Sequence, residues 1–414
     1  MSPLLSVEDA RARILQHVAP LGPERVPLEH CVDRVLAVPV VAGRALPAFD
    51  DSAMDGYAVR AAEVAPGVRL PVAFAVAAGQ AGDQALLVGT AARIFTGAPL
   101  PPGADAVVIQ EDTVADGEYV VLQVHVSQGE NVRRAGHDVG LGTPVLAAGR
   151  VLSPGDVALL AALGHPQIEV GRVPTVAILS SGNELVEAGG PPPARGQVVA
   201  SVGVALAAAV RALGGRPRLL PVVADEPVAT RAAVASAASA DVLLTIGGMS
   251  VGAHDHMAHT LRALCGDGLA FHKVAIKPGK PLAFGMLGAC RVFGLPGNPV
   301  SALVAFEVFV RPALLGLMGH TRVLRRPVPA LLTHPLPAGG SRAEYRRATV
   351  GWSAGRRTVD ARRNPSSGAL SSLAGADALL PIAVGAAAKA AGDEVEVLLL
   401  GPDLAVDRLI LSGG

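Results

Sequence analysis

Strand-like and helix-like segments alternate between Val173 and Leu317, and this alternation limits the possible fold more than any other feature of the sequence. Apolar runs of strand length are separated by longer segments with helical periodicity, which is typical of a mainly parallel sheet with helices on both faces. Residues 173–320 are therefore predicted to form an α/β domain. Its predicted elements are strand 175–179, helix 201–213, strand 218–223, helix 227–238, strand 242–246, helix 257–264, strands near 271–276, 282–286 and 290–294, and helix 299–317.

Polar turns follow three of the predicted strands, at Ser180–Glu184, Gly247–Asp255 and Gly294–Asn298. In sheets of this kind, ligands bind beyond the carboxyl ends of the parallel strands. The three turns should therefore share one edge of the sheet. Glu184, which comes just past a buried strand, would place a carboxylate in the crevice at that edge.

Two of these turns combine glycine with the start of a helix. Gly247-Gly-Met-Ser-Val-Gly252 and Gly294-Leu-Pro-Gly-Asn-Pro-Val-Ser301 would both present free backbone N–H groups, which suit an anion. The first turn lacks the spacing of the Walker and dinucleotide-binding motifs, so it fits either an anion site or a tight connection that needs glycine. Lys277 and Lys280 flank a Pro-Gly turn, and paired ammonium groups suit phosphate, although a solvated turn with two surface lysines would have the same sequence. Together these features favour a phosphate or oxyanion site.

Asp255 stands among three histidines, His254, His256 and His259. Short His-x-His spacings could hold zinc, but a helix should begin here, and adjacent residues on a helix point apart. The alternatives are an N-cap aspartate with exposed histidines, and a carboxylate that holds Mg²⁺ beside a phosphate. Magnesium fits better than zinc because Mg²⁺ takes few protein oxygens together with waters.

Three further aspartates have local structural explanations. Asp55 precedes Gly56, and Asp-Gly is a strong hairpin-turn pair. Asp225 precedes Glu226-Pro227 and is interpreted as a helix N-cap. Asp138 lies in a turn between glycines. From the residues alone, these three carboxylates are interpreted as turn and cap chemistry.

Outside the α/β segment, short apolar runs alternate with Gly/Pro turns. Residues 47–142 predict an antiparallel β module, a small barrel or sandwich, inserted into an extended domain made of the flanks 1–46 and 143–172. Residues 321–414 predict a further β module. The predicted elements of these parts are helix 6–18, strands 72–77, 85–88, 106–109 and 119–126, helix 154–163 and strand 392–400.

Composition excludes several classes of protein. The chain has 414 residues, more than one core usually serves, so two to four domains are expected. The formal net charge of zero does not indicate a nucleic-acid or anionic membrane partner, and no uncharged apolar run reaches the ~18 residues that span a bilayer. Acidic residues near the N-terminus argue against a signal peptide, and three cysteines without a C-x-x-C pair fit the reducing cytoplasm.

Seven arginines crowd the last module. A basic face for a phosphate, a nucleic acid or a partner is one interpretation, but the zero net charge and the scarcity of aromatic residues favour a solvated face or a dimer contact. These arginines are Arg342, Arg346, Arg347, Arg356, Arg357, Arg362 and Arg363.

Seven motifs stand in the chain in a fixed order. They are Ser52-Ala-Met-Asp-Gly-Tyr-Ala-Val59, Arg93-Ile-Phe-Thr-Gly-Ala-Pro-Leu-Pro-Pro-Gly-Ala-Asp105, Glu130-Asn-Val-Arg-Arg-Ala-Gly-His-Asp138, Ser181-Gly-Asn-Glu-Leu185, Gly247-Gly-Met-Ser-Val-Gly252, Ala275-Ile-Lys-Pro-Gly-Lys-Pro281 and Gly294-Leu-Pro-Gly-Asn-Pro-Val-Ser-Ala302. In these motifs the chain closely resembles the MoeA/gephyrin E-domain-type molybdopterin molybdenumtransferases, and the resemblance runs from about Leu5 to the last strand. It implies an extended N-terminal domain I (1–46 and 143–172), an inserted β domain II (47–142), a molybdopterin-binding, MogA-like α/β domain III with a parallel sheet (173–320) and a C-terminal β-barrel domain IV (321–414).

The resemblance also implies a reaction and an assembly. The reaction takes adenylylated molybdopterin and molybdate, with Mg²⁺, cleaves the adenylate, inserts molybdenum at the dithiolene and releases AMP. The implied assembly is a homodimer whose cleft lies between domains III and IV of one subunit and domain II of the other. The implied further partners are the molybdopterin adenylyltransferase and the recipient molybdoenzymes of molybdenum cofactor biosynthesis.

Carried over position by position, the resemblance implies a set of site residues. Asp255 and Glu184 would hold Mg²⁺ or position water, and Asp55 and Thr96 would orient molybdate or the substrate across the dimer. The glycine turns and the lysines would hold the pterin phosphate or pyrophosphate. The catalytic residues would be Asp55, Thr96, Asp138, Glu184, Asp225 and Asp255. The substrate-binding residues would be Gly247, Gly248, Ser250, Gly252, Lys277, Lys280, Pro296, Gly297, Asn298, Pro299 and Ser301.

The chain departs from the family pattern at two places. Where the family usually has an Asp-Ser/Thr-Asn triplet, this chain has Ala200-Ser201-Val202, and where the family usually has Glu-x-Asp-Tyr/Phe, it has Ala253-His254-Asp255-His256. Because polar side chains of the family pattern are missing at these positions, a second class of function stays open. In it the chain is a catalytically reduced paralogue that binds molybdopterin as a scaffold or regulator. An adenylyltransferase of the related α/β fold suits less well, because that activity belongs to stand-alone α/β domains. The retained carboxylates favour the enzyme.

Overall fold

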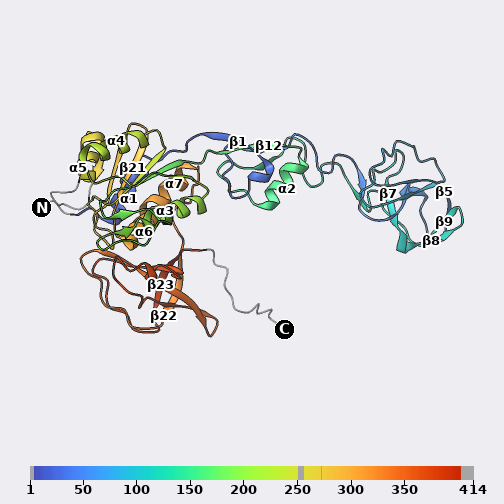
Figure 1. The fold of residues 1–414 in the computed structure, drawn as a ribbon. Coiled ribbons are helices and arrows are strands. Elements are labelled where there is room, and N and C mark those ends of the chain that lie inside the picture. Colours follow the sequence, from blue (N-terminus) through green and yellow to red (C-terminus); the bar gives the residue numbers. More distant parts are fainter. Residues whose placement is uncertain (1–3, 250–255, 272, 402–414) are drawn as a thin grey trace. The chain divides into compact units, whose positions relative to one another are not determined.

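The computed structural model describes residues 4–249, 256–271 and 273–401. Residue contacts divide the chain into two compact units, and each is described here by itself (Figure 1). The small unit is Arg25–Val170, and the large unit is Met1–Glu24 together with Gly171–Gly414.

A six-stranded sheet forms the centre of the α/β part of the large unit, in the order β16-β13-β17-β21-β20-β18. The first four strands are parallel, and β20 and β18 add antiparallel partners at one edge. The predicted, mainly parallel α/β sheet is thus confirmed, although β16 lies earlier in the chain than the predicted range 218–223. The strands are β13 (Thr175–Ser180), β16 (Arg216–Leu219), β17 (Val242–Ile246), β18 (Leu269–Phe271), β20 (Ala283–Leu287) and β21 (Cys290–Leu295).

Helices cover both faces of this sheet (Figure 1). Strand β13 shows why: Val176 and Ile178 point into one hydrophobic core, whereas Ala177 and Leu179 point into the other. The first core also contains residues of α1, α3, α6 and α7, and the second contains residues of α4 and α5. The helices are α1 (Val7–Leu15), α3 (Ser201–Ala212), α4 (Pro227–Ala237), α5 (His256–Cys265), α6 (Pro299–Ala305) and α7 (Arg311–Leu317).

The stretch from α6 to α7 is one continuous apolar segment, because the π-helical turn Phe306–Val310 joins the two helices. By length and composition alone, Pro299–Leu317 could cross a membrane. However, 78% of its most apolar window is buried inside the protein, and its residues belong to the first core. The segment is therefore accounted for as the core helix of a globular fold.

The C-terminal part of the large unit is a five-stranded β-barrel. It closes because β23 pairs with β24 over residues 349–353 and with β25 over residues 344–348. The short strand β19 (Ile276–Lys277), which comes from the α/β segment of the chain, adds a parallel partner to the start of β23. The predicted C-terminal β-barrel is confirmed. Its strands are β22 (Pro327–Leu332), β23 (Ala343–Ser353), β24 (Arg356–Asp360), β25 (Ala378–Ile382) and β26 (Glu394–Leu399).

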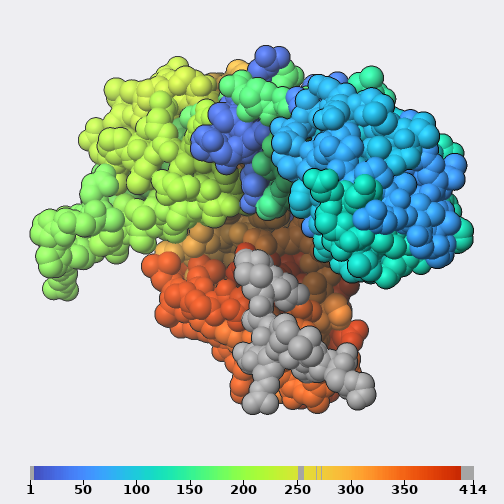
Figure 2. Space-filling view, turned by 90° about the vertical axis from the view of Figure 1, so that its right-hand side faces the viewer, coloured from blue at the N-terminus to red at the C-terminus, as the bar shows by residue number. Residues whose placement is uncertain are grey.

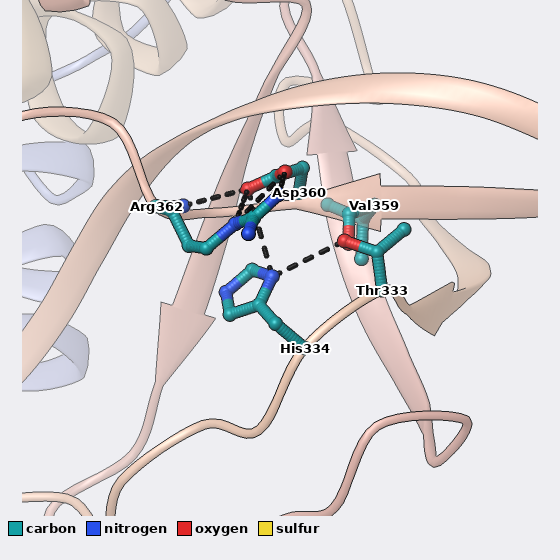
Figure 3. A network of polar contacts seen from close by, with 5 residues as sticks. All are labelled: Thr333, His334, Val359, Asp360 and Arg362. Atoms are coloured by element: carbon teal, nitrogen blue, oxygen red, sulfur yellow. Dashed lines mark hydrogen bonds and ion pairs between the residues drawn. The ribbon is translucent and has the colours of Figure 1, made fainter.

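The arginines of this barrel mostly bind groups of the barrel itself. Arg347 is 4% exposed and donates from Nε to Ser372 Oγ at 3.1 Å, so the prediction of a solvated face or dimer contact is wrong for Arg347. Figure 3 shows another case, in which Arg362 Nε lies 3.1 Å from both carboxylate oxygens of Asp360 and His334 Nδ1 lies 3.5 Å from one of them. The hydrogen bonds from Arg362 lower the pKa of Asp360 to about 2.

The small unit contains a six-stranded sheet in the order β7-β4-β6-β5-β9-β8. Both of its faces are covered, since Tyr57 and Val59 lie in one core and Ala58 lies in another. The predicted β module is present, but β5 and β6 pair in parallel rather than antiparallel, and residues 85–88 form no strand. The strands are β4 (Gly56–Val59), β5 (Arg69–Val76), β6 (Ala91–Ile94), β7 (Ala106–Ile109), β8 (Thr113–Asp116) and β9 (Tyr119–Leu122).

The rest of the small unit consists of short paired strands around one helix, α2 (Pro154–Ala162). Ser153 and Asp156 form a capping box at its start, which satisfies backbone N–H groups that the helix leaves unpaired. The pairs are β1 (Pro23–Pro27) with β12 (Gln167–Gly171), β2 (Val40–Val41) with β11 (Pro144–Leu146), and β3 (Asp51–Ser52) with β10 (Val132–Arg133). The predicted four-domain boundaries remain a prediction. Helix α1, which we assigned by sequence to the extended domain, packs into the first core of the large unit.

Candidate functional site

A cleft of about 870 Å³ opens at the carboxyl ends of β13, β17 and β21 in the large unit. This is the edge at which the sequence predicts a crevice. The three polar turns that follow these strands all contribute to its lining. The lining residues are Ser180, Ser181, Gly182, Glu184, Leu185, Val198, Val199, Ala200, Ser201, Val202, Asp225, Ile246, Gly247, Gly248, Met249, Pro281, Pro296, Gly297, Asn298, Pro299, Gly368 and Leu370.

Two carboxylates, Glu184 and Asp225, lie in this cleft. Asp225 Oδ1 accepts a hydrogen bond from Ser181 Oγ at 3.3 Å, and the Asp225 N–H donates to Asn183 Oδ1 at 3.0 Å. These bonds fix Asp225 against the turn after β13. The predicted N-cap role of Asp225 is wrong, because the N-cap of α4 is Glu226 and no side chain forms the cap hydrogen bond.

The carboxylates can be tested as magnesium ligands. Glu184 folds over its own turn, since a Cβ atom on Gly182 would lie 2.7 Å from Glu184 Oε2. The described residues contain no group of three His, Cys, Asp or Glu side chains arranged to hold a metal. Mg²⁺ needs only one or two carboxylates when waters and phosphate oxygens complete its shell. The described carboxylates of the cleft, Glu184 and Asp225, therefore fit Mg²⁺.

The turn after β17 lines the cleft with glycine backbone, in which the Gly247 N–H donates to Leu295 O at 3.2 Å. Gly247 and Gly248 have φ angles of +86° and +61°, which glycine adopts without strain. A Cβ atom on Gly247 would lie only 2.8 Å from Ser181 O on the neighbouring strand end. The close approach of the two turns therefore depends on glycine at position 247.

The start of α6 closes the cleft on the side of β21. Pro296, Gly297, Asn298 and Pro299 line it, as the sequence predicts. The loop around Ser367, which follows β24 in the barrel part, packs against this helix start, and Gly368 and Leu370 from the same region also line the cleft. Sequence reasoning missed these residues. The signal available was the turn-rich run Asn364-Pro-Ser-Ser-Gly368, but nothing in that run indicates that it packs on α6.

The opposite wall is largely apolar. Leu185, Val198 and Val199 come from the short parallel pair β14 (Leu185–Val186) and β15 (Val198–Val199), and Ala200 and Val202 come from the start of α3. The segment between β14 and β15 is exposed and projects from the surface as the green extension in Figure 2. Ala200 and Val202, the two positions at which the chain departs from the triplet of the family pattern, therefore both lie in the cleft wall.

Several predicted substrate-binding residues do not line the cleft. Lys277 Nζ lies 3.3 Å from Glu344 Oε2, and Lys280 is exposed next to the lining residue Pro281. Ser301 is buried in α6 with 4% of its surface exposed. The predicted residues Ser250, Gly252 and Asp255, together with His254, lie outside the described residues.

The predicted site residues of the small unit form a separate arrangement. Asp55 Oδ1 accepts hydrogen bonds from Thr96 N at 2.7 Å and from Thr96 Oγ1 at 2.8 Å. The bond from the Thr96 backbone N–H, followed by that from its hydroxyl, lowers the pKa of Asp55. The charge of Arg93, which donates to Gly56 O at 3.1 Å, also lowers the pKa of Asp55. Asp138 is exposed and donates its backbone N–H to Leu46 O at 3.0 Å.

Comparison with known proteins decides the family. The model "MoeA N-terminal region (domain I and II)" matches residues 5–164, "Probable molybdopterin binding domain" matches 177–316, and "MoeA C-terminal region (domain IV)" matches 329–400. Molybdopterin molybdenumtransferase 2 of Mycobacterium tuberculosis is 38% identical over 403 residues, which cover 95% of this chain and 98% of that protein. The chain belongs to the MoeA family.

Other MoeA-family members agree. The molybdopterin molybdenumtransferase of a Nostoc species is 39% identical over 331 residues, which cover 77% of this chain and 76% of the relative. The crystal structure of the molybdopterin biosynthesis MoeA protein from Pyrococcus horikoshii matches with a TM-score of 0.83 and 31% identity, and the match covers 96% of this chain and 99% of that one. The match to this solved structure thus covers the MoeA fold nearly end to end.

Proposed function

We propose that this MoeA-family chain is a molybdopterin molybdenumtransferase of molybdenum cofactor biosynthesis. It takes adenylylated molybdopterin and molybdate, inserts molybdenum at the dithiolene and releases AMP in a Mg²⁺-dependent reaction. The observation that carries this proposal is the meeting of two carboxylates, Glu184 and Asp225, with the glycine turn Gly247-Gly248 in one cleft. The Gly248 N–H of this turn offers a donor to a phosphate, and the carboxylates offer oxygen atoms to a metal or a water.

Each part of the cleft has a proposed role. The Gly248 N–H and the cleft-lining turn Gly297-Asn298 hold the phosphate or pyrophosphate of the substrate, because the Gly247 N–H already donates to Leu295 O at 3.2 Å. Glu184, together with Asp255, would hold Mg²⁺, which would neutralise charge on the phosphate oxygens. Asp225, oriented by Ser181 and Asn183, accepts a proton from the attacking water or the substrate. Lys280, which is exposed next to the lining residue Pro281, and Lys277, which lies 3.3 Å from Glu344 Oε2, would supply positive charge to the bound substrate.

The remaining predicted residues belong to a proposed homodimer, in which Asp55, Thr96 and Asp138 of one subunit complete the cleft of the other. Their support is local: the Asp55 carboxylate is held by Thr96, and the large apolar side chains Phe49, Met54 and Phe95 are exposed nearby in the sequence. Exposed apolar side chains of this size mark interaction surfaces when they cluster. The proposed location is the cytoplasm, and the proposed further partners are the molybdopterin adenylyltransferase and the recipient molybdoenzymes, with no nucleic acid and no membrane.

The test is AMP release from adenylylated molybdopterin by the purified chain, with and without molybdate and Mg²⁺. Asp225→Asn should lower the rate by ~100-fold or more, because it removes the oriented acceptor. Glu226→Gln is the matched control, since Glu226 carries the same charge at the next position, does not line the cleft and caps nothing with its side chain. Full turnover by Asp225→Asn would remove Asp225 from the mechanism.

A second function is kept because Ala200 and Val202 line the cleft where the family usually has polar residues. A catalytically reduced MoeA paralogue would bind adenylylated molybdopterin and act as a scaffold or regulator. It would bind the substrate tightly and release no AMP when molybdate and Mg²⁺ are added. Molybdate-dependent release by the wild-type chain would rule this alternative out.

A further inference from the structure

Two helices, α3 and α6, begin at the cleft. They differ in whether the backbone N–H groups of their first turns have hydrogen-bond partners. The N-terminus of α6 is occupied, because the Val300 N–H donates to Ser367 O at 3.1 Å and Asn298 Nδ2 donates to Ser367 Oγ at 3.0 Å. The N-cap residue of α3 is Ala200, and no described side chain caps that helix. Of these two helix starts, α3 is therefore the one whose first-turn N–H groups have no partner among the described residues.

The donors of the α3 N-terminus are set by the backbone. The Ala200 N–H is taken by Val186 O at 2.9 Å. The next three N–H groups, from Ser201, Val202 and Gly203, belong to the first helical turn, where no carbonyl of the helix can accept from them. Ser201 and Val202 line the cleft. Because α3 has 12 residues, its first turn also carries the positive end of a helix dipole.

A buried hydroxyl points to the same place independently. Ser180, the last residue of β13, is only 3% exposed and lines the cleft. Its Oγ lies 3.2 Å from the position that a Cβ atom on Gly203 would take, so the hydroxyl lies beside the first turn of α3. No described residue forms a hydrogen bond with this hydroxyl, and its oxygen is open to the cleft. A ligand in the cleft can therefore accept its hydrogen bond in place of water.

We infer that the N-terminus of α3, together with the hydroxyls of Ser180 and Ser201, is a subsite for a tetrahedral oxyanion. Three backbone N–H groups and two hydroxyls suit such a ligand because all five groups can donate to oxygen. The inference rests on the proposed function, which supplies two sources of this chemistry: molybdate and a phosphate group of the substrate.

The subsite would be a consequence of Ala200. An aspartate at this position would cap α3 with its own carboxylate and occupy the same N–H groups. The methyl side chain of Ala200 cannot do so, which leaves these N–H groups to a ligand.

The test closes the subsite by adding a cap. Ala200→Asp places a carboxylate on the free N–H groups, and Ala200→Asn does so without adding charge. Sodium molybdate alone and sodium phosphate alone are titrated calorimetrically into the full-length wild type and both variants. We expect the dissociation constant of the bound oxyanion to rise about tenfold or more in both variants, because donors to a charged group are lost. The melting temperature without anion should rise in both, since both residues are good N-caps.

Controls separate the subsite from general effects. Val228→Asp adds the same charge in the first turn of α4, at a residue that is 82% exposed and does not line the cleft, and it should leave oxyanion affinity unchanged. Ser180→Ala should weaken binding several-fold. The oxyanion that the wild type binds more tightly identifies the source of the ligand.

Two outcomes overturn the inference: the wild type binds neither oxyanion, or Ala200→Asn binds as tightly as the wild type. AMP release is measured on the same preparations. Release without oxyanion binding overturns this inference alone, and binding without release supports the subsite and overturns the proposed function.

Discussion

Gly247 is the position at which one added carbon atom should do most damage to the cleft. Its φ angle is +86°, and an alanine in this left-handed region costs roughly 1–2 kcal/mol. The new Cβ atom would also lie 2.8 Å from Ser181 O. A backbone oxygen cannot rotate away as a side chain can, so the ends of β13 and β17 would have to separate, at a further cost of roughly 1–2 kcal/mol. Gly247→Ala should therefore lower the free energy of unfolding by roughly 2–4 kcal/mol.

A matched control isolates the contact from the backbone conformation. Gly214, at the end of α3, has a φ angle of +84°, and a Cβ atom there would meet nothing within 4 Å. Gly214→Ala should therefore cost only the backbone term, about 1 kcal/mol. Urea unfolding at pH 7 measures both losses. AMP release should fall further in Gly247→Ala, because Ser181 would move and Asp225 is hydrogen-bonded to it. Equal losses of stability in the two variants would refute the reasoning.

Three other predictions concern separate parts of the chain. Asp360→Asn should destabilise the barrel by about 1–2 kcal/mol at pH 7, because Arg362 lowers the pKa of Asp360 to about 2 and one pKa unit is worth about 1.4 kcal/mol. Since the folded-state pKa of Asp360 lies below its unfolded-state pKa, this contribution to stability is present above about pH 4 and is lost as the pH falls toward 2. Urea unfolding followed by Trp352 fluorescence should show that the stability difference between the wild type and Asp360→Asn shrinks over this range. A stability difference that stays constant with pH would contradict the prediction. Thr96→Val should slow AMP release about tenfold, because Asp55 loses a hydrogen bond, whereas Thr96→Ser should keep most activity; equal rates for both would contradict the role. Ser153→Ala should lower the free energy of unfolding by about 1 kcal/mol by removing the α2 cap, and an unchanged urea midpoint would argue against it.

The α/β part could be predicted well because local pattern and tertiary environment agree there. The run 242–246 is continuously apolar, and all five residues of β17 are buried in the centre of the sheet. Pro154, Pro227 and Pro299 each mark the first turn of a helix, where a missing N–H costs nothing. Residues 85–88 are equally apolar but form no strand, since Leu86 fills a core while Leu87 and Val88 are exposed. Burial of a single residue leaves no periodic signal for a strand.

The cleft could be predicted only in part, because some of its residues depend on pairings between distant segments. Lys277 is directed by the pairing of β19 with β23, which makes Glu344 its cross-strand partner. The residues around Lys277 and Lys280 in the sequence do not indicate the pairing of β19 with β23. The same holds for Gly368 and Leu370, whose place in the cleft depends on the contact of Ser367 with α6. Asp225 was misassigned because Asp-Glu-Pro does not reveal which of its two acids takes the N-cap position.

The pairing of β19 with β23 also bears on how this molecule could be recombined. Ile276 and Lys277 come from the α/β segment, yet they pair with Ala343 and Glu344 of the barrel. A chimera that joins the α/β segment of one relative to the barrel of another would therefore take β19 and β23 from two different proteins, whose strands did not evolve as a pair. Crossovers at the entry and exit of the small unit leave this pair intact. Exchange of the α/β segment and the barrel together should thus be tolerated better than exchange of either one alone. This holds even though each of them is a continuous stretch of the sequence that could be exchanged by itself.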